Sequence, residues 1–226
     1  MQEARVAETG RFVIGSRVTN TVRFRPAPRL TFPSYDWISL MNWAALFDES
    51  LPYAAFLDRY AKPEQRNRWD AMHARVKLTA EQVSLLASFQ RAMPVLVLNG
   101  AWCGDCINQV PIFDHFSQAA PALQLRFLDR DAHEEVREAL MINGGQRVPV
   151  AIFLSEDFLE VCRYGDRTIS TYRRLAAQQL GPSCPTGLVP PDDSVLAAVT
   201  ADWLVEFERA QLLLRLSSRL RQKHGD

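Results

Sequence analysis

The sequence predicts an α/β fold, in which a mixed central sheet is flanked by helices, with a helical extension before it and a long helix after it. Three observations support this: strand and helix patterns alternate over residues 93–181, helical patterns fill 35–92, and one apolar helical stripe begins near residue 192. We therefore divide the chain into an N-terminal arm (1–34), a helical extension (35–92), an α/β domain (93–181), and a linker with a C-terminal amphipathic helix (182–226).

The composition is that of an ordinary globular protein. Of the 226 residues, 47% are hydrophobic and 23% charged, and the net charge is +0, so there is no basic excess of the kind that binds nucleic acid or an anionic membrane. The first residues lack the apolar core of a signal peptide, and no apolar run reaches the roughly 20 residues of a membrane span. Four cysteines are too few for a disulfide framework. We therefore expect a cytoplasmic protein without nucleic-acid or membrane partners.

The N-terminal arm carries two short β patterns, at 11–14 and 22–24, that can pair as a hairpin. Pro26, Pro28 and Pro33 follow and stop any longer ladder, because proline has no N–H to donate.

The helical extension contains four short helical patterns. Pro63 suits the first position of the third helix, and Thr79 with Gln82 forms a capping box that starts the fourth. The fourth helix is expected to run to about Ala92, with one face formed by Val83, Leu86 and Phe89. The aromatic and methionine positions of this segment are interpreted as core rather than as cofactor contacts.

The α/β domain is predicted to follow the order strand, helix, strand, helix, strand, strand, helix. The strands are expected at 94–99, 123–128, 148–154 and 158–164. The helices are expected at 104–119, after a cap at Asp131, and from a cap at Thr168 to about Leu180. The middle helix is expected to run through Val136, Leu140 and Met141, and Asn143-Gly144-Gly145 should end it with residues that tolerate left-handed backbone. The connection 155–157 is too short for a crossover, so the last two strands should be antiparallel.

The stretch Trp102-Cys103-Gly104-Asp105-Cys106 lies where the first strand meets the first helix of this domain. Two residues between the cysteines place both sulfurs in the first helical turn, close enough to bridge. The unpaired N–H groups at the start of a helix stabilise a thiolate, which is the species that attacks a disulfide. The pattern is typical of a dithiol redox site.

The Cys-x-x-Cys pattern has two alternative interpretations. The two cysteines could be half of a zinc site, or they could be structural residues without a redox role. Structural zinc needs four ligands, usually as two close pairs, whereas Cys162 and Cys184 are isolated and the four histidines form no H-x-x-x-H pair. Free cysteine also often acts as a small buried hydrophobe. We expect neither a metal nor a cofactor.

Residues from about 94 to 181 resemble thioredoxins. The shared features are Trp-Cys-x-x-Cys after a strand, the order of elements, Val148-Pro149 at the start of a strand, and the later Gly165. In that family the proline is cis and packs against the disulfide. The resemblance implies a thioredoxin-like fold and a thiol–disulfide oxidoreductase.

The match is closer to a poorly characterised bacterial subgroup of thioredoxin-like proteins. Its members carry Trp-Cys-Gly-Asp-Cys, an Arg-x-Leu-x-Arg-Asp segment, Asn-Gly-Gly before the proline, and a helical N-terminal extension. In this chain the two middle motifs are residues 126–131 and 143–145. The substrate cannot be carried over from this subgroup.

The resemblance also implies roles for individual residues. Cys103 would be the exposed nucleophile that forms a mixed disulfide with the substrate, and the more buried Cys106 would resolve it. Trp102 would cover one side of the site, and Gly104 would let the turn pass close to the substrate. Pro149 and the backbone beside it, at Val148, would hold a substrate strand.

Two positions depart from the thioredoxin pattern. Asp105 stands where thioredoxin has proline, and Val97 stands where it has a buried aspartate that is thought to relay protons. A carboxylate about 7 Å from the thiolate repels it by about 1 kcal/mol at an effective dielectric of ~40, which favours a reductant. Asp105 is also a candidate for proton transfer near Cys106. His115 is a second candidate proton donor, with a packing role as its alternative.

We therefore expect protein or small-molecule disulfides as substrates, and an unidentified reducing partner. A non-catalytic binding or chaperone module stays an alternative, as does a partner-specific redox sensor or repair enzyme. The presence of both cysteines argues against an inactive fold.

Asp192 or Asp193 is expected to start a long C-terminal helix, whose apolar face includes Trp203 and Phe207. An apolar face of this size must be buried against another protein surface, because its exposure to water would cause association. We expect it to pack against the helical extension, or to pair with the same helix of a second chain, so the protein is expected to be a monomer or a homodimer.

Overall fold

The computed structural model describes residues 41–178 and 192–226. These residues belong to one unit of the chain, 36–226. The hairpin predicted in the N-terminal arm and most of the predicted linker lie outside the described residues.

A four-stranded mixed sheet forms the centre of this unit, in the order β2-β1-β3-β4. The strands are β1 (Met93–Asn99), β2 (Leu123–Asp129), β3 (Val150–Leu154) and β4 (Glu160–Gly165). β1 is parallel to β2, and β3 is antiparallel to both β1 and β4. The predicted α/β class and the antiparallel pairing of the last two strands are therefore confirmed.

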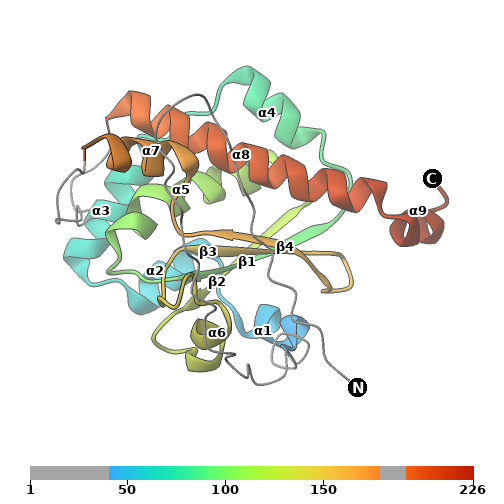
Figure 1. The fold of residues 1–226 in the computed structure, drawn as a ribbon, viewed down its shortest axis with the longest axis horizontal. Coiled ribbons are helices and arrows are strands. Elements are labelled where there is room, and N and C mark those ends of the chain that lie inside the picture. The colour runs from blue at the N-terminus through green and yellow to red at the C-terminus, as the bar shows by residue number, and fades with distance from the viewer. Residues whose placement is uncertain (1–40, 179–191) are drawn as a thin grey trace, which may run out of the picture. The chain divides into compact units, whose positions relative to one another are not determined.

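Helices cover both faces of the sheet (Figure 1). α5 (Gly104–Ala119) and α8 (Asp193–Leu216) lie over one face, whereas α1 (Trp43–Glu49) and α6 (Glu134–Ala139) lie over the other. All seven residues of β1 are buried. A strand that is covered on both faces needs a continuous apolar run rather than alternation, and this is why the β1 sequence does not alternate.

The extension before the sheet consists of α1, α2 (Tyr53–Tyr60), α3 (Pro63–His73) and α4 (Ala80–Ala87). Pro63 is the first residue of α3, as predicted. The capping box of α4 is also present, because Thr79 Oγ1 accepts from the N–H of Gln82 (3.3 Å) and Gln82 Oε1 accepts from the N–H of Thr79 (2.9 Å). Both helix starts were therefore readable from the sequence.

The end of α4 differs from the prediction. The helix stops at Ala87 instead of near Ala92, and the Ser88 hydroxyl bonds back to the carbonyl of Leu85 (2.6 Å). Of the face predicted to be buried, Leu86 and Phe89 are buried but Val83 is 42% exposed. The shorter helix touches the core only around Leu86, so Val83 faces solvent.

The turn between β2 and α6 also differs from the prediction. α6 begins after His133, and Asp131 does not cap it. Asp129 organises the turn instead, because its Oδ1 accepts from the N–H groups of Asp131 (2.9 Å) and Ala132 (3.1 Å). α6 ends at Ala139, before the predicted Met141. Of the residues predicted to end it, Asn143 (φ 49°) and Gly144 (φ 71°) have left-handed backbone, whereas Gly145 does not.

β3 and β4 begin at Val150 and Glu160, two residues later than expected. α7 (Ile169–Gln178) starts directly after Thr168, as predicted, and its predicted end at Leu180 lies outside the described residues.

The predicted C-terminal helix is two helices. Its start was predicted correctly, because the Asp192 carboxylate accepts from the N–H of Val195 (2.9 Å) and caps α8. α8 ends at Leu216, and Ser217 caps the short α9 (Ser218–His224). Within 41–178 and 192–226, no helix combines the length and the apolar character needed to cross a bilayer.

The apolar face of α8 packs on the α/β domain. The Trp203 ring lies 4.5 Å from that of Phe113 on α5 and 5.0 Å from that of Tyr164 on β4, measured between centroids. The Phe207 ring lies 4.9 Å from that of Phe153 on β3. The prediction that this helix would pack against the helical extension is right only in part. Its apolar face covers α5 and the sheet, whereas Gln211 on α8 binds the backbone N–H groups of Gln90 (3.2 Å) and Arg91 (2.8 Å) at the end of the extension.

Candidate active site

Cys103 and Cys106 lie at the start of α5, directly after the turn that leaves β1. Cys103 is the residue that caps the helix, and its sulfur accepts a hydrogen bond from the N–H of Cys106 (3.4 Å). The turn is tight: Asn99 Oδ1 accepts from the N–H of Gly100 (2.9 Å), whose carbonyl accepts from the N–H of Cys103 (3.0 Å). This local geometry brings both sulfurs to the helix N-terminus, as the spacing predicted.

The two thiols differ in access. Cys103 is 8% exposed and Cys106 is fully buried. The expectation of an openly exposed nucleophile is thus corrected, because the turn and the residues packed on it cover most of Cys103. Both cysteines are free thiols in the structure.

The pKa values of the two thiols are shifted in opposite directions. The pKa of Cys103 is lowered, because the Cys106 thiol and the N–H groups at the helix start hydrogen bond to its thiolate. Burial and the charge of Asp105 oppose this shift. The pKa of Cys106 is raised well above its ordinary value, because the thiol is completely buried. Cys103 therefore loses its proton more readily than Cys106 does.

Val148 and Pro149 lie against Cys103. Their peptide bond is cis, as the resemblance implies, and the Cys103 sulfur lies 3.7 Å from the carbonyl oxygen of Val148. Gly165 lies against the backbone carbonyl of Pro149. A Cβ at this glycine would lie 2.5 Å from the carbonyl oxygen of Pro149, so only glycine permits this approach.

Trp102 is 43% exposed, and the loop after β2 fixes its ring. Its indole N–H donates to Asp131 (3.1 Å), and the Arg130 guanidinium lies over the ring, 4.4 Å from its centroid. Arg130 also forms an ion pair with Asp131 (2.8 Å). These two residues belong to the Arg-x-Leu-x-Arg-Asp segment, and their contact with the tryptophan was not predicted.

Asp105 is paired with Arg167, which the sequence analysis did not consider. Arg167 donates from Nη2 (2.7 Å) and Nε (3.0 Å) to Asp105 Oδ2. Sixty-two positions separate the two residues in sequence, and only the loop between β4 and α7 brings them together. The carboxylate is therefore not an isolated charge beside the thiolate.

Gln109 connects the site to the C-terminal helix. This buried side chain donates from Nε2 to the carbonyls of Asp105 (3.2 Å) and Asp166 (3.0 Å), and its Oε1 accepts from the indole N–H of Trp203 (2.9 Å). A glutamine on the apolar face of a predicted helix is the one signal in the sequence that could have drawn attention to it, because buried polar groups need partners.

Neither the position of the family's buried aspartate nor His115 brings a proton carrier to the dithiol. Val97 is fully buried and brings no titratable group to the position of the family's aspartate. His115 donates from Nε2 to the carbonyl of His73 (3.0 Å), and their rings lie 4.2 Å apart. It follows Cys106 by nine residues, about 14 Å along a helix. His115 therefore has the packing role that was its alternative.

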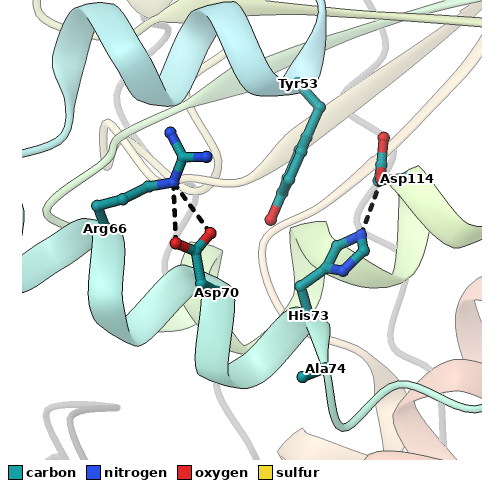
Figure 2. A pocket seen from close by; sticks show the side chains of 6 residues that line it. All are labelled: Tyr53, Arg66, Asp70, His73, Ala74 and Asp114. Atoms are coloured by element: carbon teal, nitrogen blue, oxygen red, sulfur yellow. Dashed lines mark hydrogen bonds and ion pairs between the residues drawn. The ribbon is translucent and has the colours of Figure 1, made fainter.

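A polar pocket of about 280 Å³ lies among α2, α3 and α5, apart from the two cysteines (Figure 2). It contains the His73–Asp114 pair (2.8 Å) and the Arg66–Asp70 pair (2.9 Å). None of the residues that line it belongs to the dithiol site. Over 41–178 and 192–226, no group of three or more His, Cys, Asp or Glu side chains is arranged to hold a metal ion.

Comparison with known proteins points to the same region of the chain. A family model described as thioredoxin matches residues 50–177, from the end of α1 to the end of α7. No match was found among curated proteins.

Two solved structures share the fold. A protein of unknown function from Pseudomonas aeruginosa is 19% identical, with a TM-score of 0.57 over 78% of this chain and 98% of that one. An HIV epitope scaffold is 20% identical, with a TM-score of 0.54 over 73% of this chain and 98% of that one. At these identities the likeness concerns the fold alone.

Proposed function

Because the chain belongs to the thioredoxin family, we propose that it is a thiol–disulfide oxidoreductase whose redox dithiol is Cys103 and Cys106. A fold alone does not determine an activity. The observation that carries the proposal is the position of both cysteines at the N-terminus of α5, where the Cys103 sulfur accepts from the N–H of Cys106 and where the pKa of Cys103 is lowered and that of Cys106 raised. The Cys103 sulfur also lies 3.7 Å from the carbonyl oxygen of Val148, which precedes a cis-proline where an extended substrate segment can pair.

In the first step the Cys103 thiolate attacks one sulfur of a substrate disulfide. The substrate S–S bond breaks, a Cys103–substrate disulfide forms, and the second substrate sulfur leaves as a thiolate that takes a proton from water. The exposed ring of Trp102 and the backbone at Val148 and Pro149 form the surface on which the substrate lies. Protein or small-molecule disulfides are the proposed substrates.

In the second step Cys106 attacks the sulfur of Cys103. The mixed disulfide breaks, a Cys103–Cys106 disulfide forms, and the first substrate sulfur leaves as a thiolate that takes a proton from water. Because the pKa of Cys106 is raised, its proton must be removed at this point. Asp105 is the proposed acceptor, since Val97 offers none. Two electrons pass to the substrate, and an external dithiol reductant, not yet identified, must restore the reduced protein.

Insulin reduction with dithiothreitol as the electron donor tests this proposal. The wild-type protein should accelerate reduction, whereas Cys103→Ser should not, because it lacks the attacking sulfur. Cys106→Ser should lose turnover and accumulate a mixed disulfide at Cys103. Cys162→Ser, a half-buried cysteine on β4, is the matched control and should keep full activity.

Equal activity of Cys103→Ser and wild type would overturn the proposal. A wild-type protein that binds unfolded insulin without reducing it would instead support a binding or chaperone module.

A further inference from the structure

Arg167 brings a positive charge to the carboxylate that lies between the two cysteines in sequence. Its Nη2 and Nε atoms lie 2.7 and 3.0 Å from Oδ2 of Asp105. The Arg167 side chain is 12% exposed and that of Asp105 is 21% exposed. Water and salt therefore screen this pair less than a pair on the open surface.

The loop that carries Arg167 is fixed. Gly165 packs against the carbonyl of Pro149, and the N–H of Arg167 donates to Asp166 Oδ1 (3.0 Å). Asp166 is itself bonded to residues of three other segments: Gln109, Arg147 and Tyr172. The guanidinium therefore extends from a rigid loop to the first turn of α5, and little freedom is lost when it binds Asp105.

We propose that Arg167 is a positioning residue of the redox site, which neutralises Asp105 and so limits the repulsion between this carboxylate and the Cys103 thiolate. This inference rests on the proposed function, because it assigns Arg167 a part in preparing that nucleophile. An unpaired carboxylate in the first turn would favour the protonated thiol. Asp105 does act in this direction on the pKa of Cys103.

The pair also accounts for the departure from the thioredoxin pattern. Proline at position 105 would bring no charge to the thiolate, whereas aspartate does. A chain with aspartate at this position can keep a reactive thiolate if a fixed cation cancels the added charge. Arg167 is placed to do this from the loop next to the cis-proline.

The test is the pH dependence of alkylation by iodoacetamide, followed at Cys103 by mass spectrometry of the reduced full chain. Arg167→Gln should raise the pKa of Cys103 by about half a unit to one unit, which is about three- to tenfold in its ionisation constant. Asp105→Asn should lower the pKa by a similar amount. The double variant should return close to the wild-type value, because the two charge changes cancel.

Two controls separate electrostatics from folding. Arg167→Lys keeps the charge and should stay near the wild-type pKa. Arg173→Gln removes the same charge from an exposed position on α7 and should produce a clearly smaller shift. If Arg167→Gln does not fold, Asp105→Asn and Arg167→Lys still carry the test.

An unchanged Cys103 pKa in Arg167→Gln, or a double variant that keeps the full upward shift, would overturn the inference. Its failure is distinct from failure of the proposed function. The alkylation pattern can hold in a protein that reduces no disulfide, and disulfide reduction can proceed in a protein whose Arg167 has no effect on Cys103.

Discussion

The indole N–H of Trp203 donates a hydrogen bond to Oε1 of Gln109, at 2.9 Å, in the buried space between α8 and α5. The other end of Gln109 binds the carbonyl of Asp166, in the loop beside the cis-proline. The C-terminal helix is therefore part of the framework that holds the dithiol site, and not an appendage to it.

Substitutions at Trp203 test this coupling. Trp203→Phe keeps an aromatic ring but leaves Gln109 Oε1 without its donor, and should cost about 1–3 kcal/mol in the free energy of unfolding. Trp203→Ala also leaves a cavity and should cost about 3–5 kcal/mol. Urea unfolding measures both. Leu216→Ala on the same helix is the control: Leu216 is 74% exposed, and the change should stay within about 0.5 kcal/mol. A Trp203→Ala variant as stable as the wild type would refute the coupling.

A methyl group at Gly165 should damage the site. In Gly165→Ala the new Cβ would lie 2.5 Å from the backbone oxygen of Pro149, so one of the two loops must move. We expect a loss of about 1–3 kcal/mol in unfolding free energy together with slower disulfide reduction. Gly145→Ala is the comparison, because its Cβ would first meet the flexible side chain of Arg147, at 3.3 Å. If the two alanine variants unfold at the same denaturant concentration, the close approach does not matter.

The contact between Trp102 and Asp131 should serve substrate binding. Asp131→Ala removes the acceptor of the indole N–H and the partner of Arg130, so the exposed ring gains freedom. We expect KM for insulin to rise several-fold with little change in kcat, because Cys103 itself is untouched. Steady-state kinetics decide this. Glu134→Ala, an exposed acidic residue at the start of α6, is the matched control. A fall in kcat at constant KM would show that Asp131 acts on the chemical step instead.

The stability of the reduced protein should depend on pH through Cys103. Its pKa is below the ordinary value of 9.0, so between the two values the folded protein has lost a proton that the unfolded chain still binds. Stability should therefore rise with pH across this interval, by at most about 1.4 kcal/mol per pH unit, and fall as pH drops through the folded pKa. Above pH 9 the raised pKa of Cys106 acts in the opposite direction.

Urea unfolding of the reduced protein at a series of pH values measures this dependence. Cys103→Ala should abolish the rise below pH 9, and Cys106→Ala should remove the decline above it. Identical profiles for the wild type and Cys103→Ala would show that Cys103 is not ionised in the folded protein.

The order of strands and helices was predictable because each element has a recognisable pattern in its own stretch of sequence. The strands are short apolar runs bounded by turn residues, Thr79 and Asp192 cap their helices as their sequences indicate, and Asn143 with Gly144 takes the left-handed backbone. The two cysteines were predictable for the same reason, since their spacing and the start of a helix are local features.

The residues that contact Trp102 and Asp105 were not predictable, because they lie in loops that are distant in sequence. Asp131 meets Trp102 across 29 positions, and Arg167 meets Asp105 across 62. An amphipathic stripe such as that of α8 shows that something must cover it, but not which surface does. The pattern of apolar and polar residues determines which face of a helix or strand is buried. The position of one loop relative to another depends on the whole assembled fold.

Disulfide mapping of the oxidised protein tests the central claim most directly. The full chain is equilibrated with oxidised glutathione, blocked with an alkylating reagent, digested and analysed by mass spectrometry. The account predicts one disulfide, between Cys103 and Cys106, with Cys162 and Cys184 alkylated. A disulfide from Cys103 to Cys162 or Cys184, or a Cys103–Cys106 pair that stays reduced under conditions that oxidise free dithiols, would contradict it.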